Sequence, residues 1–266
     1  MNGSNTYTAV RIGDVADWRL ICEISATGMS AFLKHIDPMQ EVVTLFEEKW
    51  DAGDDLLKKI ENAVYDHPQV LDDFSADIAL TAPKAIWVPA SVIDDDEEKA
   101  AALYNQVYKA EESEILSEQV ADAVCLYCLV PGLKAFLMRT FPGARLHSHI
   151  AVMAARFRER PADIPRVYAE IRDRQVDILA FDGKKMLMAA THHWHETSDI
   201  QYHLFNVMNV YGLDPENVQL SLSGLRDVKN ELMGEMRKTV SFVMLTMLPS
   251  LSNVALPTVS SLLLRN

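Results

Sequence analysis

Apolar and polar positions alternate most clearly between residues 167 and 194. Val167 to Ile171 alternates apolar and polar side chains with the period of two that is typical of half-buried strands, and Val176 to Phe181 and Met186 to Ala190 are predicted as the next two strands. Asp182-Gly183 separates the second run from the third and favours a tight hairpin, because glycine tolerates the positive φ of such turns. The pattern predicts three consecutive antiparallel strands.

The period then changes to that of a helix. Thr197 or Ser198 can cap a helix N-terminus, and five apolar residues follow on one helical face: Ile200, Leu204, Val207, Met208 and Tyr211. Gly212 is a good terminator. Three more elements complete the segment: a strand over Val218 to Leu222, a helix marked by Leu225, Val228, Leu232 and Met236, and a strand over Phe242 to Leu248. The predicted order is βββαβαβ.

The first part of the chain repeats this order less regularly. Strands are predicted over Arg19 to Ile24, Met29 to Ile36, Glu41 to Glu47 and Ile78 to Ala82, with a helix opened by Asp54-Asp55 before the fourth. Further strands are predicted over Ile86 to Pro89, Val124 to Val130 and Arg145 to His149, with helices from Asp94 to about Tyr108, from about Gly132 and from Ile150.

A duplicated βββαβα unit therefore organises the prediction, which is an α/β protein with mixed sheets. Residues 1–149 are expected to form the first half, with an insertion at about 90–131. Residues 150–266 are expected to form the second half, with a C-terminal tail.

Composition narrows the class of protein. Of the 266 residues, 49% are hydrophobic and 24% charged, which is typical of a globular chain. The formal net charge of −13 disfavours nucleic acid as a partner. Three cysteines without disulfide-framework spacing indicate a reducing compartment. The N-terminus lacks a signal-peptide pattern, and no apolar run is long enough to span a bilayer, so a cytoplasmic protein without a transmembrane segment is expected.

The duplicated order resembles the actin, sugar kinase and Hsp70 superfamily, whose fold is also called ribonuclease H-like. Three stretches of the sequence resemble a bacterial family of unknown function, found mainly in Bacteroidetes, that has this actin-like ATPase fold. They are residues 181–224, with Phe181-Asp-Gly and Asp199-Ile-Gln-Tyr-His, then Cys128-Leu-Val-Pro131, and Phe141-Pro-Gly-Ala-Arg-Leu-His-Ser148. The resemblance covers about residues 7–250. It implies the fold, and no established activity comes with it.

In active members of the superfamily, a hairpin turn from each half holds the nucleotide phosphates, and a glycine-containing turn holds the purine. The resemblance assigns six residues to cofactor binding if a nucleotide binds: Ser25, Thr27, Gly28, Asp173, Ser223 and Gly224. The second turn departs from the pattern, because Arg172, Arg174 and Gln175 stand where glycines are usual. Their Cβ atoms are expected to block close approach of phosphate.

Two other motifs carry candidate chemistry. His193 and His195 would share a face of a strand, with His203 nearby, but no second motif completes a zinc site. Cys125 and Cys128 have redox spacing, yet positions three apart on a strand face opposite ways. No metal site and no catalytic residue are predicted.

The sequence thus favours a non-catalytic actin-like scaffold or interaction protein with a degenerate nucleotide cleft. The partner would be another protein or a second copy of the chain, and no cofactor is required. The alternative is an ATP-binding protein or ATPase with non-standard phosphate loops, which would bind Mg-ATP. A third hypothesis is a small-molecule carrier. The apolar C-terminal tail either contacts a partner or packs against its own chain.

Overall fold

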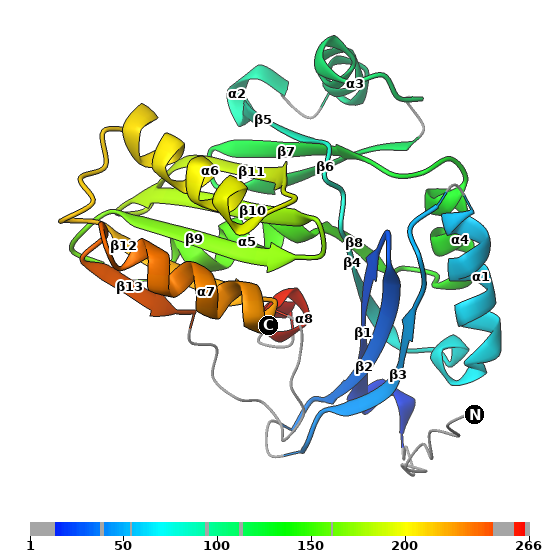
Figure 1. Cartoon of the computed structure of the whole chain (residues 1–266). Coiled ribbons are helices and arrows are strands. Elements are labelled where there is room, and N and C mark those ends of the chain that lie inside the picture. The colour runs from blue at the N-terminus through cyan, green and yellow to red at the C-terminus, as the bar shows by residue number, and fades with distance from the viewer. Residues whose placement is uncertain are drawn as a thin grey trace.

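The structure, a computed structural model, describes residues 14–37, 40–53, 55–93, 96–111, 114–160, 162–246 and 258–263. Two five-stranded mixed sheets form its frame, and a separate three-stranded sheet lies beside the second of them (Figure 1). Several predicted positions lie outside the described residues: Asp54, Asp94, residues 247–248, and most of the tail, including Leu251, Val254, Leu256 and Leu264.

The first sheet has the order β3-β2-β1-β4-β8. Its strands are β1 (Trp18–Ser25), β2 (Gly28–His35), β3 (Val43–Lys49), β4 (Ser75–Leu80) and β8 (Arg145–Ser148). The first three are antiparallel neighbours, and β4 runs parallel to both β1 and β8. The remaining elements of this half are η1 (Val15–Asp17), α1 (Leu56–Asp66), η2 (Pro68–Leu71) and α4 (Leu133–Thr140).

The second sheet repeats this arrangement with the order β11-β10-β9-β12-β13. Its strands are β9 (Arg166–Arg172), β10 (Gln175–Asp182), β11 (Lys185–His193), β12 (Gln219–Gly224) and β13 (Phe242–Leu245), joined by α6 (Thr197–Val210) and α7 (Arg226–Met236). Three antiparallel strands are again followed by two parallel ones. The predicted duplicated order of strands and helices is confirmed.

A three-stranded sheet is inserted in the chain between β4 and β8, with the order β5-β7-β6. It contains β5 (Ala85–Pro89), α2 (Ala90–Ile93), α3 (Glu97–Val107), β6 (Ile115–Val120) and β7 (Ala123–Cys128). β6 was not predicted, because five of its six residues are partly or fully exposed and only Val120 is buried. The division into residues 1–149 and 150–266 stays a prediction.

Helix α5 (His149–Arg158) connects the two halves and lies between them (Figure 1). It packs against β4 and β8 of the first half and against β10 and β11 of the second. Small side chains permit this close packing, since Ala151 and Ala154 are fully buried. Helix α5 therefore contacts both five-stranded sheets.

The last element of the described part of the chain is a short helix, α8 (Thr258–Leu263), all of whose residues are buried. It follows the second sheet in sequence but packs against α5, β1 and β4. Val259, Leu262 and Leu263 belong to the hydrophobic core that also contains buried residues of β1, β4 and α5. This part of the tail therefore packs against its own chain.

Candidate functional site

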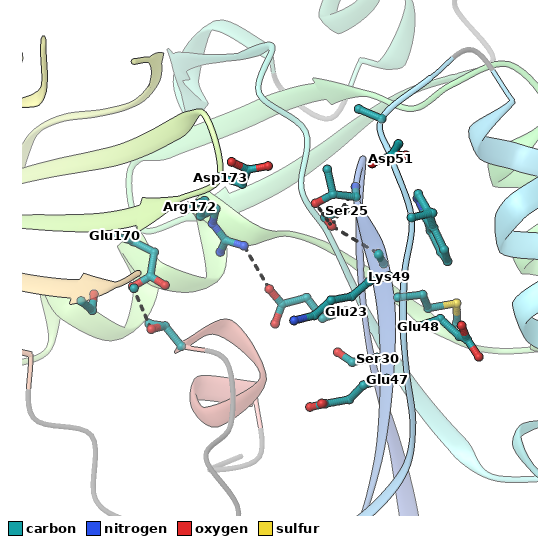
Figure 2. Close-up of a pocket in the computed structure, with 18 of the residues that line it drawn as sticks. Glu23, Ser25, Ser30, Glu47, Glu48, Lys49, Asp51, Glu170, Arg172 and Asp173 are labelled. Carbon is teal, nitrogen blue, oxygen red and sulfur yellow. Dashed lines mark hydrogen bonds and ion pairs between the residues drawn. The ribbon is translucent and has the colours of Figure 1, made fainter. Parts of the chain in front are cut away.

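A cleft of about 930 Å³ opens between the two halves, and all six residues assigned from the resemblance line it. Ser25 ends β1, Thr27 and Gly28 follow in the β1–β2 turn, and Asp173 lies in the β9–β10 turn. Ser223 and Gly224 end β12. The fold brings these positions together because β1, β9 and β12 all point their C-terminal ends toward the cleft (Figure 2). Whether they bind a nucleotide stays a prediction.

The hydroxyls of the first turn are engaged within the turn itself. Ser25 Oγ donates to the carbonyl of Gly28 at 3.2 Å and accepts from the Thr27 N–H at 3.3 Å. The Trp50 indole N–H donates to the Ala26 carbonyl at 3.1 Å and closes the turn from the side of β3. A phosphate would have to replace these local hydrogen bonds.

The two cleft glycines have structural reasons to be glycine. A Cβ on Gly28 would lie 2.6 Å from the Glu48 carbonyl oxygen of the neighbouring strand. Gly224 has φ of +93°, and a Cβ there would lie 2.0 Å from the Ile171 carbonyl oxygen. Because the backbone requires glycine at both positions, their presence does not by itself indicate a nucleotide.

Arg172 crosses the cleft at the second turn. Its Nη1 donates to Glu23 Oε1 at 3.1 Å, and its Nε donates to Asp177 Oδ2 at 2.8 Å (Figure 2). Burial opposes the charge on Arg172, but the carboxylates of Asp177 and Glu23 outweigh it and raise the pKa of the guanidinium above its ordinary value. Glu23 comes from the first half and Arg172 from the second, so the ion pair joins the halves.

Asp177 extends this network into α5. The buried Asp177 carboxylate also contacts His149 Nε2 at 3.0 Å and accepts from Thr191 Oγ1 at 2.6 Å. Burial would raise the pKa of Asp177, but His149 and Arg172 hold it well below its usual range. The Ala82 N–H, just beyond β4, donates to His149 Nδ1 at 3.3 Å. A buried polar chain thus runs from β4 through α5 to both cleft turns.

Helix α8 closes the base of the cleft. Thr258 Oγ1 donates to Glu170 Oε2 at 2.8 Å, and Ser260 donates to Glu23 Oε2 from its hydroxyl at 2.8 Å and from its backbone N–H at 3.2 Å. Burial raises the pKa of Glu170, and Arg172 opposes that shift. The carboxylates of β1 and β9 therefore receive their donors from the chain itself.

The lining of the cleft is predominantly acidic. Six carboxylate residues face three basic ones: Glu23, Glu47, Glu48, Asp51, Glu170 and Asp173 against Lys49, Arg172 and Lys229. The one central guanidinium is already paired with two carboxylates. A polyphosphate entering this cleft would meet net negative charge.

Sequence reasoning missed Glu23, Glu170 and Asp177, although a signal was present. Glu23 interrupts the apolar residues of β1, and Asp177 interrupts those of β10. A carboxylate within an otherwise apolar strand has to find a partner, because an unpaired buried charge is costly. The partners themselves lie far apart in sequence, so only the fold identifies them.

The other candidate motifs do not assemble into sites. His193 and His195 are exposed, and the ring of His203 stacks on that of His192 at 4.3 Å. Within the described ranges, no group of three or more His, Cys, Asp or Glu side chains could hold a metal ion. Burial raises the pKa of the Cys125 thiol to about 12, which makes it unreactive at neutral pH.

None of the helices in the described part of the chain has both the length and the apolar character needed to cross a membrane. No curated protein matches the chain. The structure is similar to a Bacteroides thetaiotaomicron protein with an actin-like ATPase fold and unknown function, with a TM-score of 0.83 and 20% identity over 97% of this chain and 100% of that one.

Two other solved structures are more distantly similar. One is the PilM-PilN type IV pilus biogenesis complex, with a TM-score of 0.53 and 14% identity over 86% of this chain and 88% of that one. The other is the ethanolamine utilization protein EutJ from Carboxydothermus hydrogenoformans, with a TM-score of 0.50 and 7% identity over 90% and 86%. All three likenesses concern the fold.

The sequence profile of the DUF3822 proteins, described as proteins of unknown function, matches residues 11–241, and the chain belongs to that family.

Proposed function

We propose that this protein is a non-catalytic binding protein that has kept the actin-like frame and uses its surface for protein contacts. The observation that carries the proposal is the Arg172–Glu23 ion pair across the cleft. In an actin-like ATPase, the space between the two hairpin turns holds phosphate and magnesium. Here a side chain of the protein lies between them.

The chemistry of the cleft supports the same view. Phosphate binding between two turns needs free backbone N–H groups and a metal or free cation to neutralise charge. The Ser25 hydroxyl of the first turn forms its hydrogen bonds within that turn. The second turn has Arg174 in the left-handed conformation, where glycine is usual. The residues that line the cleft are predominantly acidic. The likeness to the PilM-PilN complex supports a scaffold that binds other proteins, without identifying a partner.

A second candidate function is nucleotide binding by non-standard loops. It is favoured by the convergence of all six assigned residues on one cleft. Asp173 and Lys229 would then be the charged groups available to a magnesium–nucleotide complex.

Thermal unfolding with and without Mg-ATP separates the two functions. A ligand present at about 100 times its Kd adds about 2.7 kcal/mol to the free energy of unfolding, which is a rise of about 5–10 °C in Tm for a chain of this size. We expect a change in Tm below about 1 °C, with Mg²⁺ alone as the control. A rise of several degrees that needs ATP would refute the proposal and establish the second function.

A further inference from the structure

Helix α8 follows the second half of the protein in sequence but packs against the first. The chain reaches it after β13, the last strand of the second sheet, yet it packs against α5, β1 and β4, and its apolar residues Val259, Leu262 and Leu263 are at most 2% exposed (Figure 1). Any separation of the two halves therefore acts directly on the seat of α8.

The polar side of α8 bridges carboxylates from both halves. Thr258 donates to Glu170 on β9, and Ser260 donates to Glu23 on β1. Glu23 is also the acceptor of Arg172, so α8 and the ion pair across the cleft share one carboxylate. Thr258 itself lines the cleft. The docking of α8 and the ion pair across the cleft thus depend on one shared carboxylate, that of Glu23.

Helix α8 stands outside the duplicated unit. Both sheets and the helices α6 and α7 are complete without it. A helix of six residues is not stable alone, because helix nucleation is unfavourable and few hydrogen bonds follow. It is helical because it is docked, and undocking and unfolding of α8 are one event.

We propose that α8 is a latch that holds the two halves closed, and that its release opens the cleft between them. This inference goes beyond the proposed function, since it concerns how the halves are held and stands whether or not a nucleotide enters. The latch makes access to the carboxylates of Glu23 and Glu170 depend on the C-terminus of the chain.

Native-state amide hydrogen exchange on the full chain tests the latch. The variant Thr258→Val/Ser260→Ala removes both hydroxyl donors and changes side-chain volume little. Thr44→Val is the matched control, because Thr44 Oγ1 is buried on β3 and has no hydrogen-bond partner among the described residues. We expect exchange of residues 258–263 and of both cleft turns, 25–28 and 172–175, to accelerate together by about 10-fold or more in the double variant. Amides of α6 and α7, on the outer face of the second sheet, and all amides of the control should keep their rates.

Two results would overturn the latch. If residues 258–263 exchange at the rate of the central amides of β1 and β9, α8 is a permanent part of the core and opens only on global unfolding. If they exchange faster while both turns stay unchanged, α8 frays independently of the cleft.

The wild-type chain provides a second measurement that needs no variant. In low denaturant, a latch predicts that α8 and the two turns share one opening reaction, with the same dependence on denaturant and a lower free energy than global unfolding. Different dependences for α8 and for the turns would contradict it.

Discussion

At the scale of single residues, His147 is a histidine whose positive charge depends on two carboxylates that only the fold brings next to it. His147 on β8 contacts Asp77 Oδ1 through Nε2 and Glu118 Oε1 through Nδ1, both at 2.9 Å. A carboxylate can only accept, so both ring nitrogens must donate and the imidazole is protonated. Burial opposes this charge, but the two carboxylates outweigh it and raise the pKa of His147 to about 9.

This shift predicts a dependence of stability on pH. Because the pKa of His147 is higher in the folded state than its unfolded value of about 6.5, protonation stabilises the fold fully below that pH, and the contribution is lost as pH rises through about 9. We expect the free energy of unfolding to fall by about 2–3 kcal/mol over this interval. Urea unfolding of the wild type and of His147→Gln measures it. A variant that loses stability as steeply as the wild type would show that another group titrates.

Gly224 and Gly234 form a matched pair for testing why glycine occurs in the cleft. Gly224→Ala would place a methyl group 2.0 Å from the Ile171 carbonyl oxygen at a φ of +93°, so we expect a loss of about 3 kcal/mol or more. Gly234 on α7 has open space around it, and Gly234→Ala should stabilise the protein by about 0.5–1 kcal/mol. Chemical denaturation of both variants gives the comparison. A mild effect at Gly224 would mean that the backbone does not require glycine, and its presence would again point to a ligand.

At the scale of elements, the sequence predicts most strands and helices of the second half because each buries one face regularly. β10 and α6 begin and end within one or two residues of the predicted bounds. The cap of α6 was predicted one or two residues too late: Glu196, in a capping box with Asp199, caps the helix in place of Thr197 or Ser198. The insertion was predicted less completely. β6 has only one buried residue. The helix predicted from Asp94 to about Tyr108 is α3, and the short helix α2 before it was not predicted.

The candidate site was predictable in part for the same reason. Turns between consecutive strands are local features, so the positions of Ser25, Thr27, Gly28 and Asp173 follow from the element order once the duplication is recognised. The pairing of Arg172 with Glu23 joins residues 149 positions apart, and that of Ser260 with Glu23 joins residues 237 apart. No local pattern encodes such contacts. The residues that fill the cleft were therefore the ones that sequence reasoning could not place.

At the scale of the whole molecule, the two halves meet through a continuous buried polar chain. It runs from His149 on α5 through Asp177 and Arg172 of the second half to Glu23 of the first, and on to Ser260 of α8. Paired charges have directional contacts with one favourable arrangement. This buried network of polar side chains therefore fixes one relative orientation of the halves.

A double-mutant cycle between Arg172 and Glu23 tests this coupling. Arg172→Met leaves the buried Glu23 and Asp177 without their cation, so we expect a loss of about 3 kcal/mol in the free energy of unfolding. In a Glu23→Gln background the same change should cost at least about 1 kcal/mol less, because one of the stranded charges is already gone. Arg174→Met is the control, because Arg174 is exposed in the same turn. Its φ of +58° is equally unfavourable for arginine and methionine, so the substitution should change the free energy of unfolding by no more than about 0.5 kcal/mol. Equal costs for Arg172→Met in the two backgrounds would mean that the pair does not join the halves. The closed cleft would then depend on α5 and α8 alone.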